Sequence, residues 1–442
     1  MSAIAEVLAT MGHSVTGSDQ AASPVVVHLR ELGIEVAVGH DAAHVAGADV
    51  VAISTAIPST NPEVGAAHVA GVPVLRRAEV LAAICRVRRT IAVSGTHGKT
   101  TTTAMLALAL RGAGMEPSFI VGGEVTGLGS GASWGSGDWF VVEADESDGT
   151  FVELAAEAVV VTNVEADHLD HWGTFEALQV GFRRFLAEAS GPRVVCADDE
   201  VALQLSEGLG CLTYGTTPAA AFRMVDVVGG ADGVAFTLEH DGDVLGRVEV
   251  ALPGLHNARN AAGVVVAALA LGADFEPVVA ALAGFPGVRR RWEQRGEAGG
   301  VTFIDSYDHL PTEVAAALDA AGAGDWGRVV CVFQPHRYTR TRDLWRTFGR
   351  SFDGADLLAV TDVYSAGQEP IPGVTGKLVV DAALDVRPWR RVAWLPSRAD
   401  LLSYLSGELR PGDLCLTLGA GDLTSLPDEL RPLVAARSDS GR

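Results

Sequence analysis

Short apolar runs alternate with alanine-rich stretches along most of this chain. Runs such as 139–142, 158–162 and 328–333 consist almost wholly of valine and other apolar residues, which is typical of strands buried on both faces of a parallel sheet. The alanine-rich stretches between them space their apolar residues as helices do. The alternation predicts an α/β fold in which helices cover mostly parallel sheets.

The pattern changes at two points, which predicts three domains. With 442 residues the chain exceeds the length of about 250–300 residues at which single hydrophobic cores stop growing. We expect a Rossmann-like domain over residues 1–88, a central domain with a mostly parallel sheet over 89–296, and a Rossmann-like α/β domain over 297–442. The central domain contains a polar, strand-rich insert at about 223–252, where Gly-Gly and Asp-Gly pairs predict turns.

The first domain has an unusual beginning. Residues 2–11 form a predicted crossover helix, but no strand and no glycine loop precede it. Either the true start lies upstream or the sheet lacks a strand. Asp19 ends the strand predicted over 15–19. An acidic residue at such a position commonly contacts a ribose or a base, so we predict that Asp19 binds substrate.

The charge balance limits the partners. There are 33 Lys and Arg residues against 55 Asp and Glu residues, and the formal net charge of −22 repels nucleic acids and anionic membranes. An anionic substrate therefore needs a local basic pocket. No run approaches the ~18 apolar residues of a membrane span, and the N-terminus lacks a basic region followed by an apolar one. We expect a cytoplasmic protein that is a monomer or a homodimer.

The strongest chemical signal is a short glycine loop. The apolar run 90–94 leads into Gly95-Thr96-His97-Gly98-Lys99-Thr100-Thr101, which predicts a strand, a turn and a helix start. Glycines let backbone N–H groups converge on an anion, and the lysine neutralises the far phosphates. Thr100 is then placed to hold Mg²⁺. A plain helix N-terminus with an exposed lysine is the alternative, and the run of threonines favours the phosphate loop.

Carboxylates follow two predicted strands. Glu143 stands at the carboxyl end of the run 139–142, where open parallel sheets bind their ligands, and Mg²⁺ on a phosphate takes one or two carboxylates. The run 158–162 leads into a crowded group of acids and imidazoles, in which His168 is a candidate metal ligand or catalytic group. Solvated loop carboxylates and a structural histidine are the alternatives.

Other polar clusters lie farther along the chain. Asn260 enters an alanine-rich helix, where a helix cap or a plain helix-face residue is the alternative to a binding role, and spacing does not decide between them. Arg291 belongs to a basic run beside an aromatic residue, which favours contact with a nucleotide base or phosphate in so acidic a chain. Arg337 and Arg340 belong to the run 334–341, which directly follows the strand predicted over 328–333, and their spacing suits a carboxylate clamp.

Taken together, these runs resemble the Mur ligase family over about residues 1–425. The matching runs are Gly-Thr-His-Gly-Lys-Thr-Thr-Thr-Thr, Glu-Ala-Asp-Glu-Ser-Asp, Asn-Val-Glu-Ala-Asp-His, His-Asn-x-x-Asn-Ala, Arg-Arg-Trp-Glu, Asp-Ser-Tyr-x-His-x-Pro-Thr-Glu, Phe-Gln-Pro-His-Arg-Tyr-Thr-Arg-Thr, Pro-Ile-Pro-Gly-Val and Gly-Ala-Gly-Asp. The resemblance implies a UDP-sugar domain that lacks the family's first strand and glycine-rich loop, a central P-loop ATPase domain, and a mobile C-terminal domain that brings an amino acid.

The resemblance also implies roles for individual residues. The implied catalytic residues are Lys99, Glu143, His168 and His309, and the implied Mg²⁺ ligands are Thr100, Glu143 and His168. The implied ATP site consists of Gly95, Thr96, His97, Gly98, Lys99, Thr100, Thr101, Asn257, Asn260, Arg291 and Asp305. The implied substrate-binding residues are Tyr307, His309, Arg337 and Arg340, together with Asp19.

The implied reaction is ATP-dependent amide formation in peptidoglycan synthesis. The motifs are most similar to those of members that join L-alanine to the lactyl carboxylate of UDP-N-acetylmuramate through an acyl phosphate. A tripeptide as the joined group, or a degenerate ATP-binding relative without ligase activity, are the alternatives. Leu310 stands where the family usually has a second histidine, which bears on alanine specificity or rate, and Trp292 replaces a commoner phenylalanine.

Overall fold

The computed structural model describes residues 1–54, 56–125, 128 and 130–440. Contacts within this part of the chain define two compact units. The first unit comprises Met1–Val225, Thr237–Val248 and Arg259–Phe285. The second unit comprises Asp226–Phe236, Glu249–Ala258 and Pro286–Arg442.

The N-terminal segment contains two separate parallel strand pairs. One pair is β1 (Thr16–Asp19) with β2 (Glu35–Val38), and the other is β3 (Val51–Ile53) with β4 (Val74–Arg76). The helices are α1 (Ser2–Thr10), α2 (Pro24–Glu31), the 3-10 turn η1 (Ala42–Val45), α3 (Pro62–Ala70) and α4 (Arg77–Cys85). The predicted crossover helix over residues 2–11 is therefore confirmed as α1, and Asp19 ends β1 as expected.

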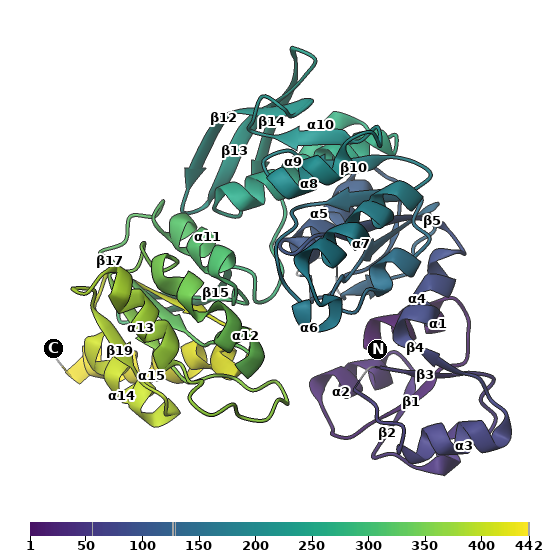
Figure 1. Ribbon diagram of the computed structural model, residues 1–442, viewed down its shortest axis with the longest axis horizontal. Coiled ribbons are helices and arrows are strands. Elements are labelled where there is room, and N and C mark those ends of the chain that lie inside the picture. Colours follow the sequence, from purple (N-terminus) through teal and green to yellow (C-terminus); the bar gives the residue numbers. More distant parts are fainter. Residues whose placement is uncertain (55, 126–127, 129, 441–442) are drawn as a thin grey trace. The chain divides into compact units, whose positions relative to one another are not determined.

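A ten-stranded sheet follows, in the order β14-β13-β12-β11-β10-β9-β5-β8-β6-β7. Its strands are β5 (Arg89–Ser94), β6 (Ser118–Ile120), β7 (Ala132–Ser133), β8 (Trp139–Glu143), β9 (Ala158–Val161), β10 (Arg193–Cys196), β11 (Leu212–Gly215), β12 (Phe222–Gly230), β13 (Gly233–His240) and β14 (Asp243–Val250). The pairings from β12 through β6 are parallel. The predicted insert is confirmed as the three long neighbouring strands β12, β13 and β14 (Figure 1).

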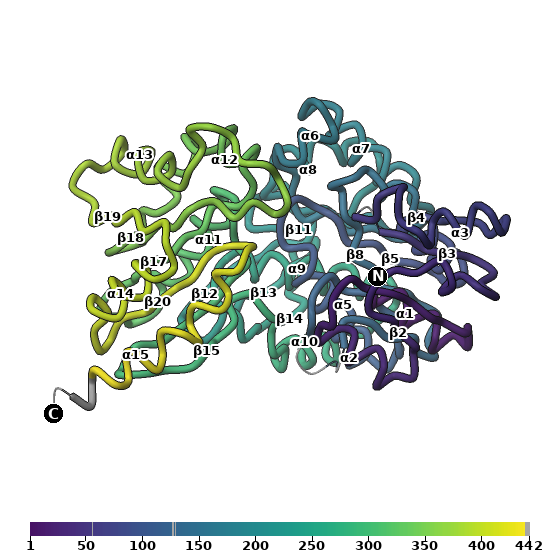
Figure 2. Tube along the Cα trace, turned by 90° about the horizontal axis from the view of Figure 1, so that it is seen from below, coloured from purple at the N-terminus to yellow at the C-terminus, as the bar shows by residue number. Residues whose placement is uncertain are grey.

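Helices cover this sheet and seal its core. They are α5 (Lys99–Gly112), η2 (Thr150–Glu153), α6 (Leu169–Trp172), α7 (Phe175–Glu188), α8 (Glu200–Ser206), α9 (Leu255–Ala270) and α10 (Phe275–Ala283). α5 and α10 lie side by side (Figure 2). A Cβ added to Gly112 would stand 2.5 Å from the Cβ of Ala281, so only glycine allows this approach. The central strands β5 and β9 are buried apart from Arg89, as their apolar runs predict.

The second unit holds a six-stranded sheet in the order β15-β16-β20-β17-β18-β19. Its strands are β15 (Glu293–Ala298), β16 (Val301–Ser306), β17 (Arg328–Phe333), β18 (Leu357–Val360), β19 (Val392–Trp394) and β20 (Asp413–Leu418). Only the β15–β16 pair among these is antiparallel. The strands predicted over 301–305 and 328–333 are confirmed as β16 and β17.

Helices lie on both faces of the six-stranded sheet and form two cores. They are α11 (Pro311–Ala321), α12 (Tyr338–Leu344), η3 (Trp345–Arg350), α13 (Lys377–Val386), α14 (Arg398–Glu408), η4 (Asp422–Ser425) and α15 (Leu426–Ser440). One core joins α11 and α13 to the sheet, and the other joins α14 and α15 to its opposite face. The α/β prediction is therefore confirmed for both units.

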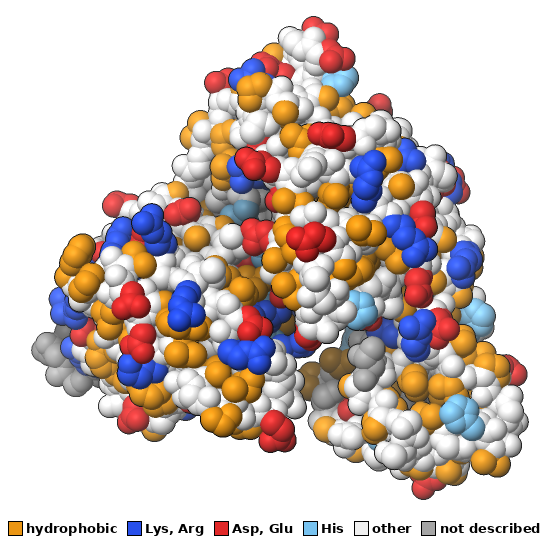
Figure 3. All heavy atoms as spheres, in the orientation of Figure 1, with side chains coloured by type: hydrophobic (Ala, Val, Ile, Leu, Met, Phe, Trp, Pro, Cys, Tyr) orange, Lys and Arg blue, Asp and Glu red, His pale blue; other side chains and the backbone are white. Residues whose placement is uncertain are grey.

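Charged side chains of both signs are interspersed on the face of the molecule seen in Figure 3. Within the described part of the chain, each helix is too short or too polar to cross a lipid bilayer.

Candidate active site

The predicted phosphate loop links β5 to α5, so the expected order of strand, turn and helix is confirmed. Gly95 has a φ of 137° and Gly98 a φ of 79°, both in the left-handed region that favours glycine. A Cβ on Gly95 would stand 2.1 Å from Oγ1 of Thr162, and one on Gly98 would stand 2.8 Å from Oδ1 of Asn260. Neither position therefore tolerates a side chain, and Asn260 lies against the loop.

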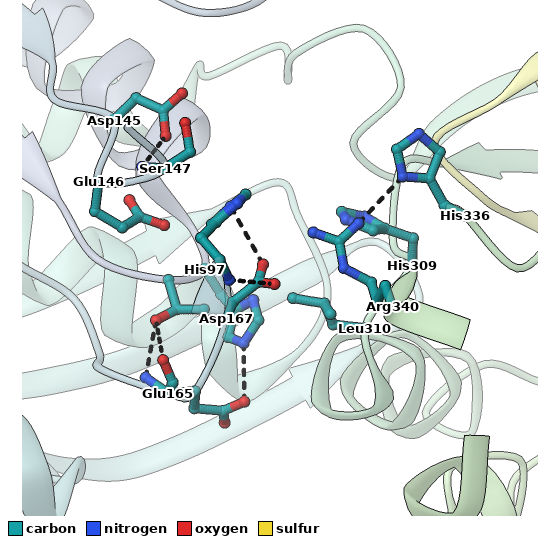
Figure 4. A network of polar contacts seen from close by, with 12 residues as sticks. His97, Asp145, Glu146, Ser147, Glu165, Asp167, His309, Leu310, His336 and Arg340 are labelled. Atoms are coloured by element: carbon teal, nitrogen blue, oxygen red, sulfur yellow. Dashed lines mark hydrogen bonds and ion pairs between the residues drawn. The ribbon is translucent and has the colours of Figure 1, made fainter. Parts of the chain in front are cut away.

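The end of strand β9 holds the loop in place. Asn163 accepts the backbone N–H of His97 at 2.8 Å and donates to its carbonyl oxygen at 3.0 Å. Thr162 donates to the same carbonyl oxygen at 2.6 Å. The N–H of Glu165 donates to Oγ1 of Thr96 at 2.8 Å, and its carboxylate lies 3.1 Å from Nε2 of His97 (Figure 4). These contacts preorganise the loop, and the sequence alone did not predict this role for Thr162 or Asn163.

Lys99 begins α5 and turns back over the loop. Its Nζ donates to the carbonyl oxygens of Gly95 at 2.7 Å and Thr96 at 3.2 Å, and to Oε1 of Glu146 at 2.9 Å. Burial opposes the charge of this ammonium, but the carboxylates of Glu146 and Asp145 outweigh it and raise the pKa of Lys99. Burial also raises the pKa of Glu146 to about 7, although Lys99 acts in the opposite direction.

The predicted metal ligands Thr100 and Glu143 are in contact. Thr100 Oγ1 donates to Oε1 of Glu143 at 3.0 Å, and the N–H of Gly122 donates to Oε2 at 2.8 Å. The contact follows from the fold, because β5 and β8 are parallel neighbours with Val93 opposite Glu143. No group of three acidic, histidine or cysteine side chains suited to a metal is found among the described residues. A cation held by Thr100 and Glu143 would therefore take its other ligands from substrate and water.

His168 caps the N-terminus of α6 in a left-handed conformation with a φ of 54°. Its backbone N–H donates to Oδ1 of Asp167 at 2.8 Å, and its Nε2 lies 3.3 Å from Oδ2 of the same carboxylate. His168 thus stands just beyond the carboxyl end of β9, as the sequence predicts, and its role at the metal stays a prediction.

Two further residues of the predicted ATP site make contacts within the protein. Thr101 is buried in the first turn of α5, and Asn257 donates to the carbonyl oxygen of Pro253 at 2.7 Å.

Asp19 is exposed at the end of β1, where its Oδ1 accepts the N–H of Ala21 at 3.1 Å. The neighbouring Ser18 donates to Oε2 of Glu63 at 2.7 Å, and the same carboxylate lies 3.4 Å from the imidazole of His40. Hydrogen bonds from Ser18 and His44 lower the pKa of Glu63 against the effect of its burial. Glu63 was not singled out in the sequence, because it is 44 positions from Asp19 and only the fold brings them near.

In the second unit, Asp305 is buried at the end of β16. Its Oδ1 accepts the hydroxyl of Thr417 at 2.7 Å and its Oδ2 accepts that of Thr424 at 2.6 Å. The guanidinium groups of Arg290 and Arg295 lie 3.7 and 3.8 Å from Oδ2. These contacts give Asp305 a structural role, tying β16 to β20 and η4, which the sequence did not indicate. Its predicted contact with ATP stays a prediction.

The residues after β16 form a cluster with the predicted arginine. The guanidinium of Arg291 lies 5.0 Å from the ring centre of Tyr307 and 3.8 Å from Oδ1 of Asp308. Nδ1 of His309 lies 3.0 Å from the carbonyl oxygen of Tyr307 and 3.3 Å from Oε2 of Glu313. The structure therefore brings Arg291, Tyr307 and His309 together, and it adds Glu313 as a residue that orients the imidazole.

His336, for which the sequence predicted no role, joins this cluster to the arginine pair. Its ring lies 5.4 Å from the ring of His309, and Nη1 of Arg340 lies 3.1 Å from its Nδ1 (Figure 4). Burial, the neighbouring His309 and Arg340 lower the pKa of His336 to about 3. Arg337 has a φ of 67° and donates its N–H to the carbonyl oxygen of Tyr364 at 2.8 Å. Leu310 is buried just before α11.

The low pKa of His336 predicts an acid-sensitive fold. Between its ordinary value of 6.5 and about 3, the unfolded chain binds a proton at this residue that the folded chain excludes. This residue's contribution to the free energy of unfolding therefore decreases as the pH falls through that range. We expect His336→Asn, which keeps an acceptor for Arg340, to lessen the fall of the thermal unfolding midpoint between pH 6.5 and 4. If the unfolding midpoint fell equally in both proteins, the idea that the folded chain keeps His336 uncharged would be contradicted.

Comparison with known families assigns nearly the whole chain. Residues 1–89 match the Mur ligase family, catalytic domain, residues 93–268 match the Mur ligase middle domain, and residues 290–421 match the Mur ligase, glutamate ligase domain. These bounds lie close to the three domains expected from the sequence.

Individual relatives are similar over nearly their full length. A UDP-N-acetylmuramate–L-alanine ligase of Bradyrhizobium sp. strain ORS 278 is 45% identical, covering 98% of this chain and 96% of the relative. The corresponding ligase of Kineococcus radiotolerans is 46% identical over 99% of this chain and 94% of the relative. The crystal structure of MurC, the UDP-N-acetylmuramate-alanine ligase of Thermotoga maritima, superposes with a TM-score of 0.82 at 27% identity, over 100% of this chain and 97% of that one.

Proposed function

The chain belongs to the Mur ligase family and has its three-domain α/β fold, and from this premise we propose that it is an ATP-dependent ligase. It joins L-alanine to the lactyl carboxylate of UDP-N-acetylmuramate, a cytoplasmic step in the synthesis of peptidoglycan precursors. The names of the relatives support the two substrates. The observation in this chain that carries the proposal is the loop of residues 95–100, with Lys99 and the Thr100–Glu143 contact at one sheet edge.

The residues present fit ATP as a substrate and Mg²⁺ as a cofactor. Gly95 and Gly98 let the loop pack closely against Thr162 and Asn260, where any Cβ would clash, and the loop enters the N-terminus of a 14-residue helix. Lys99 supplies a positive charge, Asn260 lies against Gly98, and a hydroxyl and a carboxylate offer the oxygen ligands that Mg²⁺ prefers. When bound, Mg²⁺ supplies charge neutralisation on the phosphate oxygens.

The chemistry needs activation, because a carboxylate does not react with an amine at neutral pH. We assign the phosphoryl transfer from ATP to the lactyl carboxylate to the loop, where Lys99 and the backbone N–H groups stabilise the negative charge of the transferring group. The amine of L-alanine then attacks the acyl phosphate, and phosphate leaves. We assign the carboxylate of L-alanine to Arg337 and Arg340, and we assign the alignment of the substrates to Tyr307 and His309.

Phosphate release tests the proposal. We expect release only when ATP, Mg²⁺, UDP-N-acetylmuramate and L-alanine are all present, because the acyl phosphate must form and then meet an amine. Release supported by a tripeptide in place of L-alanine would favour a murein peptide ligase, a protein whose Psychrobacter arcticus form shares the fold at a TM-score of 0.69. ATP binding without release in any mixture would favour a degenerate ATP-binding protein.

A further inference from the structure

The loop lysine already has a carboxylate partner inside the protein. Lys99 Nζ donates to Oε1 of Glu146 at 2.9 Å and lies 2.8 Å from Oε2, which is buried and accepts no hydrogen bond from the described residues. The Glu146 side chain is only 1% exposed and that of Lys99 is 14% exposed. Two largely buried, paired charges interact more strongly than an exposed pair, because water screens them poorly.

The backbone of Glu146 is fixed while its carboxylate reaches the loop. The indole N–H of Trp172 donates to the carbonyl oxygen of Glu146 at 2.9 Å, and the N–H of Gly149 donates to the same oxygen at 3.2 Å. The Lys99 ammonium also contacts the loop carbonyl oxygens of Gly95 and Thr96. The three donors of an ammonium are thereby used within the protein.

We propose that Glu146 is a positioning residue that competes with nucleotide phosphates for the Lys99 ammonium. This inference rests on the proposed binding of ATP at the loop. An ammonium that contacts a phosphate must give up at least one of its three internal contacts, since the protein uses all three donors, and Glu146 is the one charged acceptor among them. Glu146 therefore keeps the lysine ordered between turnovers and limits how tightly ADP is held after phosphoryl transfer.

The test compares Glu146→Gln with the wild-type chain by calorimetric titration of ADP and of ATP at fixed Mg²⁺. The amide keeps the size of the side chain but removes the charge that attracts the ammonium and repels phosphate. We expect both nucleotides to bind about tenfold more tightly, as expected for the loss of one charged competitor. Asp148→Asn is the matched control, because this exposed acid of the same loop contacts Thr150 and not Lys99. Its affinities should stay within about twofold of wild type.

A second measurement reads the lysine directly. The chain contains only two lysines, Lys99 and Lys377, and Lys377 is exposed and paired with Asp381. Acylation by an amine-selective reagent, followed by mass spectrometry, therefore compares Lys99 with an internal standard. In Glu146→Gln without nucleotide, we expect Lys99 to be acylated about tenfold faster relative to Lys377 than in wild type. Saturating ADP should restore its protection.

The outcomes separate the inference from the proposed function. If the wild-type chain binds ATP but Glu146→Gln binds nucleotides equally or more weakly, the inference is overturned and the proposed function is not. An unchanged acylation rate of Lys99 in the folded variant would also overturn it. Failure of the wild-type chain to bind either nucleotide would overturn the proposed function, and the inference with it. Circular dichroism and the thermal unfolding midpoint check that both variants are folded.

Discussion

Lys99→Ala is expected to lower kcat for amide formation by at least about a thousandfold, because it removes the loop's one cationic side chain from the transferring phosphoryl group. The carbonyl oxygens of Gly95 and Thr96 and the carboxylate of Glu146 would then face the phosphates without a counter-charge. The measurement is ADP formation under saturating ATP, Mg²⁺, UDP-N-acetylmuramate and L-alanine.

Lys377→Ala is the matched control for this variant. Lys377 is the other lysine of the chain, it is about half exposed on α13, and its ion pair with Asp381 is of the surface type that contributes little. We expect its kcat to equal that of the wild-type chain. Full activity in a folded Lys99→Ala protein would contradict the claim that the loop stabilises the transferring phosphoryl group.

Glu143→Gln is expected to lower kcat at physiological Mg²⁺ by at least about a hundredfold, since even residues that merely support a metal ligand cost 10–100-fold when lost. The amide keeps an oxygen near Thr100 but loses the charge that a hard cation requires. The concentration of Mg²⁺ needed for half-maximal activity should rise. Steady-state rates across a Mg²⁺ series at fixed ATP measure both effects.

Glu153→Gln controls for the loss of one negative charge. Its carboxylate is 45% exposed and lies 3.6 Å from Arg76, away from the Thr100–Glu143 contact. We expect its Mg²⁺ dependence to match that of the wild-type chain. If Glu143→Gln needed the same Mg²⁺ concentration for half-maximal activity as the wild-type chain, Glu143 would not be a ligand of the metal.

The sequence predicted those parts of the site that depend on local pattern. The short apolar run before Gly95 predicts a buried strand, and two glycines followed by Lys99 and threonines suit a turn into a helix. Glu143 was predicted beside Thr100 because carboxyl ends of neighbouring parallel strands share a sheet edge, and the 3.0 Å contact confirms this. Both the loop and the Thr100–Glu143 contact could be predicted from where a strand ends and which residues follow it.

The residues that the sequence did not reveal act through distant partners. Asn163 supports the loop from 66 positions beyond His97, and Glu146 meets Lys99 across 47 positions. Side-chain rotamers and the pairing register of the strands decide which hydroxyl or carboxylate near a strand end contacts a given backbone group. Local spacing in the sequence encodes neither of them. His336 illustrates the same limit, because its low pKa arises from burial beside His309, which belongs to a different loop.

Asp305 shows how a strand-end position can serve structure. Its place after an apolar run resembles that of Glu143, yet its two oxygens accept hydroxyls from Thr417 and Thr424, 112 and 119 positions away. The difference lies in what the neighbouring strand presents, since β20 places a threonine opposite Asp305. A carboxylate at a strand end therefore does not by itself indicate a binding site.

The central claim is that ATP phosphorylates the lactyl carboxylate before the amine attacks. The most direct measurement uses UDP-N-acetylmuramate labelled with ¹⁸O in that carboxylate, followed by mass spectrometry of the products after turnover with ATP and L-alanine. The account predicts ADP and inorganic phosphate that carries one carboxylate oxygen, because the bond to phosphorus forms at that oxygen and the carbonyl carbon later releases it. Unlabelled phosphate, or the label in AMP, would contradict the account.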